Sequence, residues 1–152
     1  MKYIIETKEN HILTITLNRP KVLNAFCHEM HEELCASLNR AATEDDIRVV
    51  LINSSIEKAF SAGGDLKEEV KLTASDAVPF SLHGLNTINA IRHCPVPVIC
   101  VADGYALGAG FELILAADFT LATRRTKIGM PSVRLGSTTA WGGTSMLVRT
   151  VG

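Results

Sequence analysis

The first strands of the chain are indicated by a strict alternation of apolar and polar positions. Leu13, Ile15 and Leu17 alternate with threonines, which is typical of a strand with one buried face. A short apolar run and a polar turn at residues 8–10 come just before it. Residues 2–17 are therefore predicted to form a β-hairpin.

A different spacing follows the break at residues 18–20. Large apolar side chains recur every four residues and predict an amphipathic helix, with Asn24 placed to cap its start; they are Phe26, Met30, Leu34 and Leu38. The acidic residues 44–46 indicate a surface turn. The continuous apolar run at residues 49–52 predicts a central strand.

The succession of strand, glycine turn and helix then occurs twice. The predicted elements after the central strand are a glycine turn at 60–65, a helix over 77–91, a strand over 96–101, a second glycine turn at 104–110, a helix over 111–117 and a strand over 119–122. Repeated strand-helix units without a linker predict an α/β fold.

Composition narrows the class of protein. The chain has 152 residues, of which 47% are hydrophobic and 20% charged, with a net charge of -1. These values fit one domain with a full apolar core. The only adjacent basic pair is Arg124-Arg125, so a nucleic-acid partner is not expected. No apolar run approaches the roughly 20 residues of a membrane span, and no membrane partner is expected.

The start of the chain and its cysteines suggest a reducing compartment. Met1-Lys2 leads directly into a strand-like stretch without the apolar region of a secretory signal, so a cytoplasmic location is expected. Four cysteines contain no CxxC pair and are interpreted as buried thiols, without disulfides or a metal site; they are Cys27, Cys35, Cys94 and Cys100.

Both glycine turns admit a structural interpretation. Gly63-Gly64 can simply supply a turn after a buried strand. The segment 108–110 opens a helix, where backbone amides favour negative charge, but it lacks both the P-loop and the GxGxxG pattern. Glu112 follows in an apolar helix, and burial of this acid is costly unless it is capped, paired or used in chemistry.

Three ordered segments together resemble the crotonase, or enoyl-CoA hydratase/isomerase, family. They are residues 17–25, 58–67 and 104–113. The resemblance covers nearly the whole chain and implies a crotonase-like α/β core of repeated ββα units arranged as a spiral. It implies that residues 1–152 form one acyl-CoA-binding core, the N-terminal portion of a longer family domain without its C-terminal helices.

The resemblance also implies the chemistry of the site. The amides of Gly64 and Ala109 would form an oxyanion hole for the thioester carbonyl, and Glu112 would transfer protons. Two aimed amides stabilise the negative charge that an enolate places on this oxygen. The position of the family's second acid holds Ser132. We therefore expect Glu112 to act as the only acid, with Ser132 orienting water or substrate.

The same resemblance assigns substrate contacts to residues of several segments. They are Lys21, Ala25, Ala62, Asp65, Leu66, Lys67 and Gly108. For Lys21, a contact to the CoA phosphates and a role as a solvated turn residue both remain open. Trp141 is interpreted as a packing residue, and the histidines of the predicted helices as surface or packing residues.

The implied function is that of an enoyl-CoA or dienoyl-CoA hydratase that uses an acyl-CoA thioester. Alternatives are an isomerase, decarboxylase or hydrolase of the same superfamily, or a non-catalytic acyl-CoA-binding or assembly subunit. No cofactor is expected beyond the coenzyme A of the substrate, because amides suffice to stabilise the enolate. The resemblance also implies a homo-oligomer, which would be a trimer or a dimer of trimers if the full family domain is present.

Overall fold

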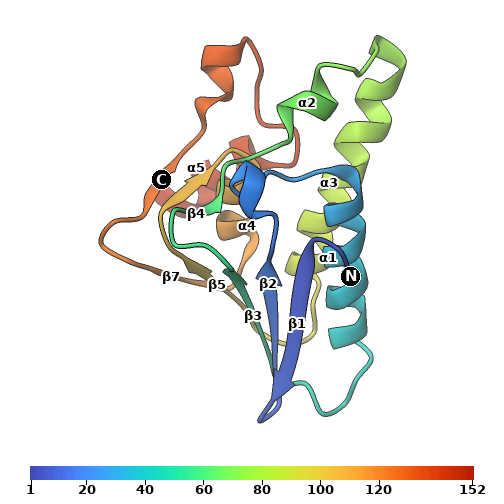
Figure 1. Cartoon of the computed structure of the whole chain (residues 1–152), viewed down its shortest axis with the longest axis vertical. Coiled ribbons are helices and arrows are strands. Elements are labelled where there is room, and N and C mark those ends of the chain that lie inside the picture. The colour runs from blue at the N-terminus through green and yellow to red at the C-terminus, as the bar shows by residue number, and fades with distance from the viewer.

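A computed structural model describes all 152 residues of the chain. Its main sheet has five strands in the order β1-β2-β3-β5-β7, and a second sheet has the order β4-β6-β8 (Figure 1). The main sheet consists of β1 (Ile4–Glu9), β2 (Ile12–Leu17), β3 (Val49–Ser54), β5 (Val98–Ala102) and β7 (Phe119–Ala122). The second consists of β4 (Ala59–Ser61), β6 (Tyr105–Leu107) and β8 (Lys127–Gly129).

The main sheet confirms the predicted hairpin and the predicted central strand. β1 and β2 pair antiparallel across a turn at Asn10 and His11, both of which have positive φ. All later pairings in this sheet are parallel, and β3 lies in its middle between β2 and β5. The alternating residues Leu13, Ile15 and Leu17 are fully buried, so one face of β2 packs into the core as expected.

Five α-helices and three short 3-10 helices complete the fold. The α-helices are α1 (His28–Ala41), α2 (Leu66–Glu69), α3 (Ala77–Arg92), α4 (Ala109–Ala116) and α5 (Gly143–Val151). The 3-10 helices are η1 (Pro20–Val22), η2 (Ala74–Asp76) and η3 (Pro131–Leu135). α1 and α3 run side by side along one side of the main sheet in Figure 1, and α4 packs against both α3 and α5.

The predicted start of the first helix is wrong. α1 begins at His28 with Cys27 at its N-cap, and Asn24 is not its cap. The Asn24 amide instead donates to Ser54 Oγ and to the Phe60 carbonyl, while its oxygen accepts from the backbone of Arg19. A side chain that can satisfy buried groups on three segments is more useful there than at a helix end.

The second sheet went unpredicted because its strands have only three residues each. β4 overlaps the first predicted glycine turn and β6 lies within the second, and α2, β8 and α5 had no predicted counterpart. Periodicity over three residues does not separate a strand from a turn. No helix in the structure is long and apolar enough to cross a membrane.

Candidate functional site

The two glycine turns meet because the strands before them are neighbours. β4 and β6 pair in parallel, so their carboxyl ends lie at the same edge of the second sheet. Gly63 and Gly108 follow these ends, both at positive φ (112° and 49°). A Cβ placed on Gly63 would lie 3.7 Å from Gly108 Cα and 3.1 Å from Leu107 O. The turns therefore touch through backbone atoms, as only glycine permits.

The amides predicted as oxyanion donors come from these two turns. Gly64 N takes part in no hydrogen bond within the protein. Ala109 is the first residue of α4, and the first hydrogen bond of that helix runs from Glu112 N to Gly108 O at 2.9 Å. Amides in the first turn of a helix have no acceptor within the helix. Two backbone donors on touching turns are thus available to an anionic ligand atom.

Glu112 lies on the first turn of α4 and is 3% exposed. Its Oε1 accepts hydrogen bonds from Trp141 N at 3.0 Å and Gly143 N at 2.9 Å. Gly143 is the first residue of α5, so this oxygen also faces the positive end of a helix dipole. The carboxylate thereby joins α4 to the start of α5 through Oε1.

The protonation of Glu112 reflects two opposing effects. Burial raises the pKa of its carboxyl group above the ordinary glutamate value, and the amides of Gly143 and Trp141 oppose this rise by stabilising the anion. The net direction is upward. A carboxylate with a raised pKa is a better proton acceptor than an exposed one, which suits a general base.

Most predicted substrate contacts lie on two segments that run side by side. Ala62 N donates to Leu23 O at 2.9 Å and Phe26 N to Gly63 O at 2.8 Å, which joins residues 21–26 to the first glycine turn. Lys21, in η1, and Lys67, in α2, are exposed. Of the other predicted contacts, Ala25 is buried, Ala62 is half-buried and Leu66 is exposed.

Asp65 is already engaged within the protein. Its Oδ2 lies 2.8 Å from Arg19 Nη2 in an ion pair, and its Oδ1 accepts from Lys67 N at the start of α2. Burial opposes ionisation, but the hydrogen bond from Arg19 prevails and the pKa of Asp65 is lowered. The role of Asp65 is therefore to hold the first turn against the segment that carries Arg19.

Ser132 lies on a different element from Glu112. It lies half-buried in η3, and no hydrogen bond joins its hydroxyl to the carboxylate. Its carbonyl accepts from Ser137 N at 3.0 Å. Met130, Glu112 and Thr139 instead surround Gly143, because a Cβ on that glycine would lie within 3.0 Å of an atom of each.

Two features of the site were missed by sequence reasoning. The first is the pair of amides that hold Glu112, which belong to a segment with no predicted structure. The second is Glu69, whose Oε1 would lie 1.8 Å from a Cβ built on Gly64. A carboxylate thus touches the Cα of a predicted oxyanion donor. Five residues of sequence separate the two, and only the turn into α2 brings them together.

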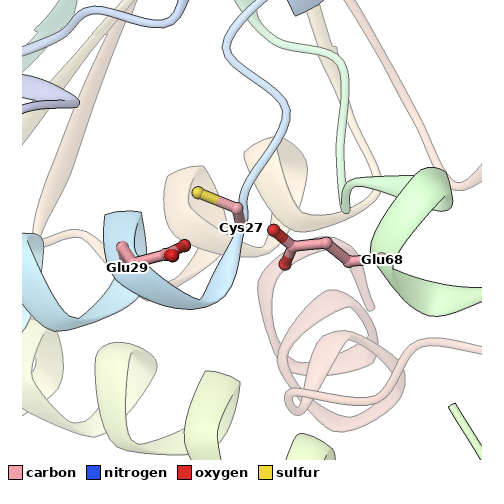
Figure 2. Close-up of side chains that lie close together, drawn as sticks. All are labelled: Cys27, Glu29 and Glu68. Carbon is pink, nitrogen blue, oxygen red and sulfur yellow. The ribbon is translucent and has the colours of Figure 1, made fainter. Parts of the chain in front are cut away.

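A cluster of possible metal ligands lies beside the start of α1. The ligand atoms of Cys27, Glu29 and Glu68 are all within 4.8 Å of one another (Figure 2). Glu68 Oε2 accepts from His28 N at 3.1 Å, and burial raises the pKa of the Cys27 thiol. A protonated thiol is a poor metal ligand. The expectation of a site without metal stays a prediction.

Comparison with known proteins identifies the family of the chain. Residues 7–152 match the family described as enoyl-CoA hydratase/isomerase. The chain is 34% identical over 149 residues to the crotonyl-CoA hydratase of Syntrophomonas wolfei and 31% identical over 149 residues to the short-chain-enoyl-CoA hydratase of Clostridium acetobutylicum. Each alignment covers 98% of this chain and 57% of the relative.

A solved structure shows the same architecture. The crystal structure of an enoyl-CoA hydratase from Bacillus anthracis superposes with a TM-score of 0.95 at 33% identity, covering 99% of this chain and 59% of that one. The chain thus spans a little over half the length of such relatives. The predicted crotonase-type α/β fold is confirmed, and the chain belongs to the enoyl-CoA hydratase/isomerase family.

Proposed function

We propose that the protein hydrates a short enoyl-CoA thioester, with the negative charge of the intermediate held by Gly64 N and Ala109 N. The observation that supports this proposal is the contact between the two glycine turns, whose amides Gly64 N and Ala109 N have no acceptor within the protein. The names of the relatives, crotonyl-CoA hydratase and short-chain-enoyl-CoA hydratase, support the same substrate class.

The mechanism uses the thioester carbonyl as an electron sink. Addition of water at Cβ moves the π electrons of the double bond toward Cα and the carbonyl, and charge develops on the carbonyl oxygen. Two fixed amides stabilise that charge, each by about 3 kcal/mol in comparable holes. Glu112 Oε2 takes the proton from the attacking water, while Oε1 keeps its bonds to Trp141 and Gly143.

Binding of the CoA moiety is assigned to the segment around η1. Lys21 is exposed and forms no ion pair, so its ammonium group is available to phosphate oxygens. Ala25 and Ala62, on the two adjoining segments, are proposed to contact the CoA moiety as well. The proposal includes no metal or organic cofactor beyond the CoA of the substrate, since backbone amides stabilise the enolate and a carboxylate accepts the proton of water.

A homo-oligomeric assembly is part of the proposal. β7 is an edge strand of the main sheet. Phe119 and Leu121 occupy alternate positions of this strand and are 64% and 61% exposed. Neighbouring apolar side chains at a sheet edge favour burial against another polypeptide surface. We assign this surface to contact with a second copy of the chain.

The test is the turnover of crotonyl-CoA. Loss of the absorbance of the conjugated enoyl group measures this turnover. We expect wild-type protein to form 3-hydroxybutyryl-CoA and Glu112→Gln to lose about 10²–10⁴-fold in rate. A panel of 3-enoyl, malonyl and saturated thioesters separates hydration from isomerisation, decarboxylation and hydrolysis. Tight thioester binding without turnover that depends on Glu112 would instead identify a non-catalytic acyl-CoA-binding subunit.

A further inference from the structure

Glu69 is an acid that the fold brings to the candidate site and that no part of the proposed mechanism uses. A Cβ on Gly64 would lie 1.8 Å from Glu69 Oε1 and 3.1 Å from its Cδ. The carboxyl group therefore occupies the space that a side chain at position 64 would fill. It is in contact with the residue whose amide is proposed to bind the thioester oxygen.

The surroundings of Glu69 do not suit a purely structural acid. The side chain is half-buried and forms no hydrogen bond or ion pair with the rest of the protein. Burial raises the pKa of its carboxyl group, and the negative charge of Asp65 raises it further. Asp65 itself is paired with the Arg19 guanidinium. A half-buried carboxyl group without a partner in the protein is available to water or to a ligand.

We propose that Glu69 is the second catalytic acid of the site and exchanges the proton at Cα of the acyl group. This inference rests on the proposed function. It accounts for the neutral Ser132 at the position where the family resemblance expects an acid, because the missing carboxyl group is provided from the turn that carries Gly64. Glu112 and Glu69 then approach the substrate from α4 and α2, the elements that follow the two donor amides.

The proton balance assigns one step to each acid. Water forms the C–O bond at Cβ and gives a proton to Glu112, while the π electrons of the double bond pass to the thioester as an enolate. Protonated Glu69 then donates its proton to Cα, the C–H bond forms and the carbonyl is restored. Glu69 is left ionised and Glu112 protonated, and exchange with solvent water resets both groups.

The two roles are separated by a saturated substrate. Butyryl-CoA has no β-hydroxyl group to eliminate. Exchange of its Cα protons in D₂O therefore reports on the acid at Cα alone, and NMR measures the rate of this exchange. We expect Glu69→Gln to slow this exchange about 10²–10⁴-fold. We expect Glu112→Gln to lose crotonyl-CoA hydration and to exchange the Cα protons faster than Glu69→Gln does. Glu68→Gln is the matched control, because its carboxyl group faces Cys27 instead of Gly64.

A second, independent experiment moves the Glu69 carboxyl group without removing it. Gly64 does not have positive φ, so alanine fits its backbone, and the added Cβ meets only the flexible end of Glu69. Gly64→Ala retains the donor amide but moves the acid. We expect it to slow Cα exchange as Glu69→Gln does, and the double variant to be no slower than the slower single variant, which is the signature of a shared interaction.

The outcomes distinguish this inference from the proposed function. Wild-type exchange in Glu69→Gln, with hydration that still depends on Glu112, would overturn the role of Glu69 and leave the proposed function standing. Loss of exchange in Glu112→Gln but not in Glu69→Gln would assign both proton transfers to Glu112 and also overturn it. A wild-type protein that neither hydrates nor exchanges any thioester would refute both. Equal melting temperatures of wild type and Glu69→Gln exclude misfolding as the cause.

Discussion

Glu112 combines a structural and a proposed catalytic task in one carboxyl group. Oε1 accepts two backbone amides at the start of α5, which offsets part of the cost of burying an acid. The same bonds orient the group, so that Oε2 is held in one place when it takes a proton. The costly burial that the sequence pattern indicated is thus resolved by acceptance of amides, and the acid needs no cation.

Substitutions at Glu112 separate these tasks. Glutamine retains an oxygen that accepts from Trp141 and Gly143, so Glu112→Gln is expected to fold with near wild-type stability. Glu112→Ala leaves both buried amides without an acceptor and is expected to lower the free energy of unfolding by about 1–3 kcal/mol per amide. Urea unfolding of the two variants measures the difference, and equal stabilities would show that the amide bonds contribute nothing.

His31 is a buried base next to other rings. It is 3% exposed and packs edge-on against Trp141, with ring centroids 4.7 Å apart. Its Nδ1 lies 2.8 Å from Thr87 Oγ1, and Nε2 has no partner. Burial, reinforced by the charges that His83 and His28 can carry, lowers the pKa of His31 to about 3. The folded protein therefore keeps this ring neutral.

A pH dependence of stability follows from the lowered pKa of His31. Below pH 6.5 the ring of His31 is protonated in the unfolded chain. In the folded chain it stays neutral down to about pH 3, where its lowered pKa lies. As the pH is lowered through this window, the free energy of unfolding is expected to decrease by up to about 1.4 kcal/mol per pH unit. Chemical denaturation at pH 7 and pH 5 should show that His31→Phe loses less unfolding free energy between these two pH values than wild type does. The exposed His93 offers a control variant, His93→Asn, which should keep the wild-type loss.

Two contacts between elements of the fold position the site. The first joins the turns after β4 and β6 at Gly63 and Gly108. The second joins α3 to the segment before α5: a Cβ at Gly84 would lie 2.0 Å from Trp141 Cε2, so the indole, 4% exposed, rests directly on the helix backbone. The backbone amide of this tryptophan is one of the two that hold Glu112.

A methyl group at Gly63 tests the contact between the turns. Gly63→Ala meets Leu107 O at 3.1 Å and also takes positive φ, so we expect a loss of about 1–3 kcal/mol in unfolding free energy together with weaker thioester binding. Gly136→Ala is the matched control, because Gly136 also has positive φ but has open space around it. Equal losses in stability and unchanged binding in both variants would contradict the importance of the turn contact.

The contact between α3 and Trp141 can be followed by fluorescence, because the chain has one tryptophan. Gly84→Ala improves helix propensity by up to about 1 kcal/mol, yet its Cβ must displace the indole. We expect a red-shifted emission and a reduced rate of hydration, since the amide that holds Glu112 moves too. Asn86→Ala, an exposed site on the same helix, should leave the emission unchanged. An unshifted emission in Gly84→Ala would show that the packing is not as described.

At the scale of the whole molecule, the apolar surface is unevenly covered. The core extends from the hairpin through α1 and the middle of the main sheet to α4, whereas every residue of β7 is exposed. Exposed apolar side chains also mark β8 and the end of α5, at Ile128 and Val151. The side of the molecule that carries the C-terminal elements therefore resembles an interface more than a finished surface.

Association through β7 has a direct test. We expect wild-type protein to sediment as an oligomer and Phe119→Ser with Leu121→Ser to shift it toward the monomer, because each serine removes apolar area from the surface proposed to be buried. The exposed apolar residues of α2 and α3 provide a matched control in Leu66→Ser with Leu82→Ser. A wild-type monomer at all concentrations, or an equal response to both pairs of substitutions, would refute the assignment.

Much of the fold follows from local patterns. The alternation in β2 and the apolar run in β3 are properties of neighbouring residues, so their faces could be predicted. The glycine turns and Glu112 could be singled out because glycine and a buried acid are costly without a reason. The three-residue strands of the second sheet could not, since pairing between distant segments creates them. The true cap of α1 was missed because Asn24 found better partners on other segments.

The amino-acid sequence by itself determined the α/β class, the family resemblance and the positions at which small residues and one buried acid were needed, because these depend on side-chain type and spacing. Only the tertiary structure decided that Gly63 and Gly108 touch, that two amides of a distant segment hold Glu112, and that Glu69 rests against Gly64. The physical reason is that the parallel pairing of β4 with β6 and the turn into α2 set these distances, and such contacts leave no periodic trace along the chain.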